Sequence, residues 1–146
     1  MAIRTHKFFT KALRESAVIM QITDGNLYET ANDEVEPDNM PLPYVIVSHL
    51  GTQNQVGHKD NGVESDMDTD TITVEIAAES DDALCDIAQL VRDAIRKAVD
   101  SFGDEEAEAW GFGITDYQFS TDGVVFDDMK PCFWTRFTYQ CETFNK

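Results

Sequence analysis

Positively charged residues are scarce in this sequence. The 146 residues include 11 Lys and Arg against 28 Asp and Glu, which gives a formal net charge of -17 at pH 7. A surface that grips DNA or RNA needs clustered cations that displace counterions from the phosphates. The composition therefore argues against specific nucleic-acid binding, and the same excess of acids disfavours contact with an anionic membrane surface.

Long apolar runs are also missing. No run approaches the roughly 20 residues that a membrane-spanning helix needs. Near the N-terminus, the stretch MAIRTHKFFTKALRES is interrupted by Lys7, Lys11 and Arg14, where a signal peptide would need an unbroken apolar centre. We therefore expect a cytosolic protein with no membrane partner.

Cysteine is rare, and the three that occur have no spacing typical of a zinc site: Cys85, Cys132 and Cys141. We expect all three thiols to be reduced. The histidines stand in separate sequence contexts, without a second histidine or a cysteine at ligand spacing: His6, His49 and His58. Phosphate-loop, GxGxxG and GxSxG motifs are absent. These features predict a protein that is not an enzyme and has no metal or other cofactor.

Apolar residues are nevertheless present in the proportion of a folded domain. They make up 42% of the chain, and 9 Phe, 4 Tyr and 2 Trp exclude a disordered acidic tail. A chain of this length fits one domain around one core. We expect a single domain over residues 1–146.

The sequence pattern of the N-terminal half predicts one helix and two strands. Apolar residues recur at helical spacing from Thr5 to about Met20. The stretch MPLPYVIVSHLG begins with prolines, which cannot join a sheet ladder, so a strand is expected from Tyr44 to Leu50. Its first four residues are all apolar, which indicates burial on both faces. A second strand is expected in TITVEIAA, where Ile72, Val74 and Ile76 alternate with polar residues.

The C-terminal half predicts a second helix and a hairpin. Ser80 can cap a helix that ends near Phe102, and apolar residues from Leu84 to Val99 fall on one stripe. The segment DEEAEAWGFG is expected to be an acidic connection. Strands are then expected from Ile114 to Phe119, Val124 to Phe126 and Cys132 to Cys141, with an Asp-Gly hairpin turn between the first two.

Together these elements predict an α+β fold. We expect a mainly antiparallel or mixed β-sheet, two helices packed on one side, and a long acidic loop. The acids concentrate from Glu29 to Asp38 and within a long loop or hairpin tip from Gly51 to Asp70. The stretch DMDTDT resembles the start of a calcium loop, but Thr71 and Ala77 stand where such a loop needs Gly and Glu. A solvated acidic loop is therefore favoured over a calcium site.

Three stretches carry a resemblance to a known family: LPYVIV from Leu42, TITVEIAAESDDALCDIAQLVRDAI from Thr71, and the closing FWTRFTYQC. They resemble the tail completion proteins of long-tailed bacteriophages and prophages, which include tail terminators and head-tail joining proteins. The resemblance implies a homo-oligomeric ring, commonly a hexamer, on the head-proximal end of the tail tube. Such a ring ends tube growth and joins tail to head. The implied partners are tail-tube and neck proteins, and the implied locations are the bacterial host cytoplasm during assembly and the virion tail.

Charged residues suggest how such a ring would assemble. A head-to-tail ring needs two different, complementary patches on each subunit. One hypothesis pairs a cationic stripe with an acidic segment of the next subunit: Arg4, Lys7, Lys11 and Arg14 with Glu34, Glu36 and Asp38. A second places the acidic loop at the ring lumen, where carboxylates would repel DNA phosphates: Asp60, Glu64, Asp66, Asp68 and Asp70. The alternative function is a monomeric acidic module that binds a protein partner or mimics nucleic acid.

Overall fold

The computed structural model describes residues 4–30, 40–54, 67–128 and 131–145. Its helices are α1 (Thr5–Arg14), α2 (Ala17–Ile22), α3 (Asp81–Asp100) and α4 (Asp104–Trp110). Its strands are β1 (Leu27–Glu29), β2 (Tyr44–Asn54), β3 (Met67–Ala78), β4 (Phe112–Thr121), β5 (Val125–Asp127) and β6 (Cys132–Asn145).

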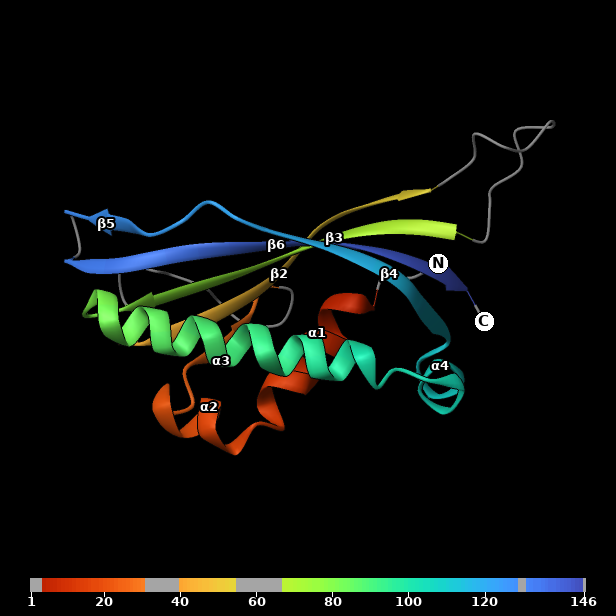
Figure 1. The fold of residues 1–146 in the computed structure, drawn as a ribbon, viewed down its shortest axis with the longest axis horizontal. Helices are drawn as coiled ribbons and strands as arrows, with labels where there is room; N and C mark the ends of the chain where they lie inside the picture. The colour runs from red at the N-terminus through yellow and green to blue at the C-terminus, as the bar shows by residue number, and fades with distance from the viewer. Residues whose placement is uncertain (1–3, 31–39, 55–66, 129–130, 146) are drawn as a thin grey trace.

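The six strands form one mixed sheet, with helices on one of its faces (Figure 1). The strand order is β1-β2-β3-β6-β4, and β5 pairs with β6 beyond the end of β4. Among the described strands, only β1 and β2 run parallel, and the other pairs are antiparallel. The predicted α+β class with a mixed sheet is therefore confirmed. In the described residues, no helix has both the length and the apolar character that a membrane crossing requires.

The central strands bury apolar side chains on both faces, as the sequence predicts. Val45 and Val47 of β2 join the core under α1 and α3, together with Ile72, Val74 and Ile76 of β3. Tyr44 and Ile46 of β2 belong to a second, smaller cluster. Because successive strand residues point to opposite faces, this cluster lies on the other side of the sheet.

Two predictions about helices were wrong. The expected helix from Thr5 to Met20 is divided into α1 and α2 because Ser16 takes an extended conformation, with φ -83° and ψ 105°. Its hydroxyl accepts a hydrogen bond from the amide of Ile19 and so caps α2. The expected acidic connection contains α4, whose N-terminal amide at Gly103 donates to the Glu106 carboxylate. A short helix can thus begin at an acidic run when the acid at its third position accepts from the N-cap amide, which is one half of a capping box.

The predicted loops and hairpin also need correction. β1 lies at the start of the expected acidic segment from Glu29 to Asp38. The expected loop from Gly51 to Asp70 is shorter than predicted, because β2 continues to Asn54 and β3 already begins at Met67. The Asp-Gly stretch does not form a hairpin between β4 and β5, because both strands pair with β6 along one edge. Thr135 of β6 donates its hydroxyl to the carbonyl of Gly123 at 2.7 Å, which supports this interruption of the edge strand.

Candidate functional site

Polar side chains gather beneath the N-terminal end of α1, where β2 and β3 extend past the apolar core. We call this set the polar cluster: Thr5, His6, Glu29, His49, Thr52, Asn54, Asp68 and Asp70. It lies on the helix-covered face of the sheet, because Asp68 and Asp70 alternate in phase with Ile72 and Val74 of the core. Both carboxylates are almost wholly buried, at 1% and 0% exposure. Predicted as part of a solvated loop, they instead belong to a strand.

A β-bulge brings the β2 members onto the same face. The register between β2 and β3 shifts between His49 and Gly51, so Thr52 stands opposite Asp70 and Asn54 opposite Asp68. Without the extra residue, the side chains of Thr52 and Asn54 would point to the other face. Leu50, at the bulge, is 69% exposed.

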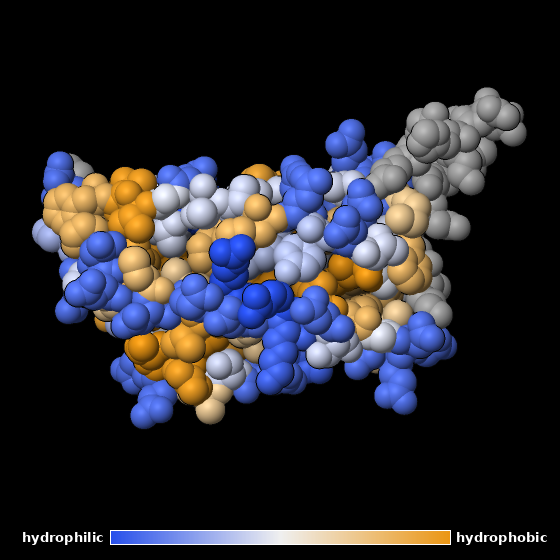
Figure 2. Space-filling view, viewed as in Figure 1, coloured by the Kyte–Doolittle hydropathy of each residue, from blue (hydrophilic) through white to orange (hydrophobic). Residues whose placement is uncertain are grey.

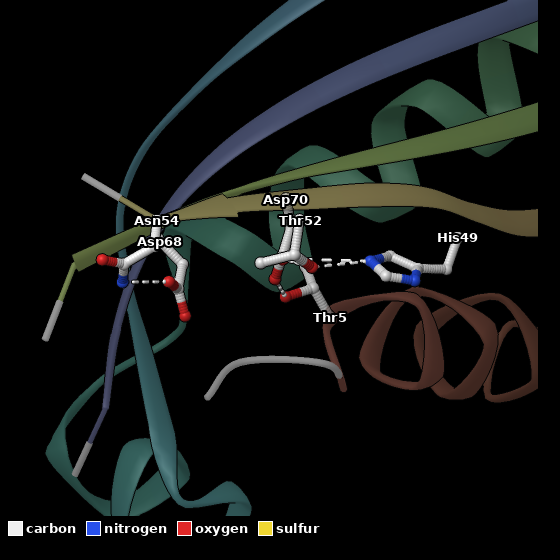
Figure 3. Close-up of polar contacts among 6 residues, drawn as sticks. All are labelled: Thr5, His49, Thr52, Asn54, Asp68 and Asp70. Atoms are coloured by element: carbon white, nitrogen blue, oxygen red, sulfur yellow. Dashed lines mark hydrogen bonds and ion pairs between the residues drawn. The ribbon is translucent and has the colours of Figure 1, made fainter. Parts of the chain in front are cut away.

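Asp70 is the centre of the cluster (Figure 3). The hydroxyl of Thr5 donates to its Oδ2 at 2.6 Å, and the hydroxyl of Thr52 donates to its Oδ1 at 2.5 Å. Thr5 is the first residue of α1, so this carboxylate also lies at the positive end of the helix dipole. Asp70 therefore joins the start of α1 to both β2 and β3.

His49 completes this chain of contacts but does not form a catalytic triad. Its Nε2 lies 2.9 Å from the Thr52 hydroxyl oxygen and 3.9 Å from Oδ1 of Asp70. A nucleophilic hydroxyl must give its proton to the histidine. Here the Thr52 proton points to the carboxylate, which leaves the hydroxyl to accept from the ring. The arrangement fastens segments together rather than activating an oxygen.

Asp68 is held by an amide from the neighbouring strand. Nδ2 of Asn54 donates to its Oδ1 at 2.8 Å and to the backbone carbonyl of Met67 at 3.2 Å. This contact lies beside the Asp70 group in Figure 3. In the part of the chain that the structure describes, no group of three or more His, Cys, Asp or Glu side chains is placed to hold a metal ion.

His6 joins the cluster from α1. Its ring stacks on that of His49, with 5.2 Å between centroids and 23° between planes. Its Nε2 lies 3.8 Å from Oε1 of Glu29, which also accepts from Nζ of Lys7 at 3.3 Å. Burial lowers the pKa of His6 below its ordinary 6.5, outweighing the opposite effect of Glu29. Its Nδ1 is buried and has no hydrogen-bond partner among the described residues.

Sequence reasoning missed this cluster. His6 and His49 lie far apart in the chain and meet only because α1 packs on β2. A signal was present for the acids, because Asp68, Asp70 and Ile72 are spaced two residues apart in DMDTDTITVEI. The alternation that predicts the strand could therefore have been extended toward the N-terminus. No such signal predicts the histidine pair.

The predicted cationic stripe lies on α1 and the residue before it, but its members make different contacts. Arg4 donates to the backbone carbonyl of Trp110 at 3.2 Å, and its guanidinium lies 5.6 Å from the centre of that indole ring. Lys11 lies 5.8 Å from the same ring and 3.6 Å from Glu15. Lys7 pairs with Glu29. Arg14 is exposed in the last turn. Six of the predicted acidic site residues lie outside the described residues: Glu34, Glu36, Asp38, Asp60, Glu64 and Asp66.

Apart from Leu50, exposed apolar side chains of the described residues gather in two places. Figure 2 shows apolar colour at the end of the molecule that carries β5 and below it, over α2. The first place contains Val124, Val125 and Phe126, and the second contains Val18 and Ile22, all exposed. A groove of about 670 Å³ runs between α1, α3 and α4, with Phe8, Leu90 and Trp110 among its lining residues.

Comparison with known proteins gives a likeness of fold. No family model and no curated protein sequence matches the chain. One similar solved structure is a chain of the "Virion of native gene transfer agent (GTA) particle", with a TM-score of 0.61 and 13% sequence identity. The match covers 96% of this chain and 94% of that one. The two chains therefore share a fold over nearly their whole lengths.

Proposed function

We propose that this chain is a structural protein of a phage-like particle, and specifically a tail completion protein. In this role it forms a homo-oligomeric ring at the head-proximal end of the tail tube, ends tube growth and joins tail to head. The observation that carries the proposal is the likeness of fold to a chain of a gene transfer agent virion, which covers both chains almost completely. The sequence resemblance to tail completion proteins supports the finer role.

The distribution of charge supports assembly of identical copies. Seven of the 11 Lys and Arg residues lie in two short regions, before and within α1 and in the C-terminal half of α3: Arg4, Lys7, Lys11, Arg14, Arg92, Arg96 and Lys97. α1 itself holds no acid. A subunit with separate cationic and acidic surfaces can make the unlike contacts that a head-to-tail ring requires.

The contacts within the subunit indicate which cations of the stripe can meet the next subunit. Lys7 is engaged by Glu29 of its own subunit, whereas Lys11 and Arg14 are exposed on α1. We therefore assign Lys11 and Arg14 the principal part in contacting acids of the next subunit, including Glu34, Glu36 and Asp38. The lumen proposal rests on Asp60, Glu64 and Asp66, because the carboxylates of Asp68 and Asp70 are buried within the subunit.

Light scattering over a concentration series tests the ring. We expect a discrete species of about six subunits, each of 16.4 kDa, that dissociates as salt screens the charged contacts. The double variant Lys11→Glu/Arg14→Glu is expected to weaken assembly at least tenfold, because each reversal places like charges together. Arg96→Glu is the control, since Arg96 is about as exposed as Lys11 and also pairs with an acid of its own helix, but lies on α3, outside the proposed contact. A monomer at every concentration would contradict a ring that forms in free solution.

A further inference from the structure

We propose that His6, stacked on His49, is a pH-sensitive switch that holds the first turn of α1 on the sheet while the His6 ring is neutral and releases it when that ring is protonated. This switch is a property of the subunit and does not depend on the proposed ring. The moving part is the turn from Arg4 to Lys7. Phe9 and Leu13 anchor the rest of α1, since both are fully buried in the core.

Polar contacts hold this first turn. Thr5 donates to Asp70 of β3, Lys7 donates to Glu29 of β1, and His6 stacks on His49 of β2. The turn thus touches three neighbouring strands through groups whose interactions depend on charge. α1 has no side-chain cap at Arg4, so the first turn is fastened by these side-chain contacts rather than by a cap.

The charged groups around His6 are of both signs. Glu29 from β1 and Asp70 from β3 favour a charged ring, whereas Lys7 from α1 and His49 from β2 oppose it. The acids are already engaged: Glu29 binds Lys7, and Asp70 accepts the hydroxyls of Thr5 and Thr52. A proton on His6 would place a charge on a ring whose centroid lies 5.2 Å from that of His49, and both His49 and Lys7 oppose that charge. Burial of His6 is the largest of the effects that lower its pKa and so disfavour its charged form.

The direction of the effect follows from linkage. The pKa of His6 is lowered in the docked state, so the released state binds the proton more readily. Docking is therefore fully favoured above about pH 6.5 and weakens as the pH falls through the lowered pKa. In that range the equilibrium for release should rise up to about tenfold per pH unit for each proton taken up.

Trp110 offers a reporter of docking. The centre of its ring lies 5.9 Å from that of Phe8, and the ring lies beside Arg4 and Lys11. In a Trp134→Phe background, emission from Trp110 can be followed from about pH 8 to about pH 5, above the ordinary titration of carboxyl groups. We expect a reversible transition with its midpoint below 6.5, while far-UV circular dichroism stays close to its value at neutral pH.

Histidine variants test the assignment. His6→Gln should remove the transition, because glutamine does not titrate. His49→Gln should shift it by at least half a pH unit, because the substitution takes away the stacked ring that opposes charge on His6. His58→Gln is the control and should leave the transition unchanged. The proposal is overturned if the transition is absent from the parent protein, persists in the His6→Gln variant, or coincides with loss of the circular dichroism signal.

A direct readout covers the case in which a variant does not fold. NMR titration of the imidazole protons of the unmutated protein should give a pKa for His6 below 6.5, and a value at or above 6.5 would overturn the switch. The same samples can be measured by light scattering. Failure of the ring with an intact histidine transition would reject the proposed function alone, and the reverse result would reject the switch alone.

Discussion

At the scale of single residues, the most consequential side chain is Asp70. It is fully buried, and both of its oxygens accept hydroxyl hydrogen bonds. A buried carboxylate is costly unless such partners satisfy it, so Asp70 and its two threonines act as a unit. The unit decides where α1 begins relative to the sheet.

Replacing Asp70 with alanine should therefore destabilise the fold by about 3 kcal/mol, because the buried hydroxyl of Thr5 and the half-buried one of Thr52 lose their acceptor. Urea denaturation measures the change in free energy of unfolding. Asp93→Ala provides the comparison: Asp93 forms a partly exposed ion pair with Arg96, worth at most about 1 kcal/mol. Equal losses in the two variants would contradict the central role of Asp70.

The cysteines give a second residue-level prediction. Cys85 is exposed, whereas Cys132 and Cys141 are buried, and none of the three forms a disulfide among the described residues. Burial raises the pKa of Cys141 to about 12, which further suppresses its thiolate. A thiol reagent at mildly alkaline pH should modify one cysteine per native chain and three per denatured chain. Modification of all three in the native protein, or of none, would contradict this burial pattern.

The burial of individual residues could be predicted where one hydrophobic period extends over a long segment. Ile72, Val74 and Ile76 follow strand alternation and are fully buried as expected. Asp68 and Asp70 obey the same alternation, but their charge favoured a loop in sequence reasoning. Their burial depends on Thr5, Thr52 and Asn54, which come from other segments. Composition alone does not reveal such partners.

At the scale of elements, close packing of strands sets a requirement at Gly113. This β4 residue stands opposite Phe144 of β6. A Cβ atom at Gly113 would clash with the Phe144 ring, so the aromatic side chain covers the glycine. Aromatic cover of an edge-strand glycine supports the register of the pair.

Gly113→Ala should therefore cost about 1 to 3 kcal/mol, since the Phe144 ring must leave its position. Gly51→Ala is the matched control, because Gly51 also lies in a strand, but a methyl group there would meet no atom of the described residues within 4 Å beyond its chain neighbours. Thermal or urea unfolding of both variants gives the comparison. A larger loss at Gly51 than at Gly113 would contradict the packing described for β4 and β6.

Elements were predictable where local signals were complete. α3 has a serine cap, acids in its first turn and one apolar stripe, and it begins after Ser80 as expected. The break between α1 and α2 depends on one serine inside an otherwise helical pattern. β1 has only three residues and exists through parallel pairing with β2, a contact between distant segments. The Asp-Gly stretch has the sequence of a hairpin turn, but β4 before it and β5 after it both pair with the longer β6 instead of with each other.

At the scale of the whole molecule, the sheet ends at an uncovered strand. Among the described residues, β4 pairs only with β6, and the nearby β5 region exposes Val124, Val125 and Phe126. Open edges and exposed apolar residues are features that further chains commonly cover in assemblies. They are compatible with a subunit that works among copies of itself and other particle proteins.

The most direct measurement of the central claim is the position of this chain in a particle. Phage-like particles purified from cells that encode it can be labelled with a gold-conjugated antibody against the chain and imaged by electron microscopy. The proposed function predicts label at the junction of head and tail, at one site per particle. Particles that lack the chain, or that carry label along the whole tail or at its distal end, would contradict it.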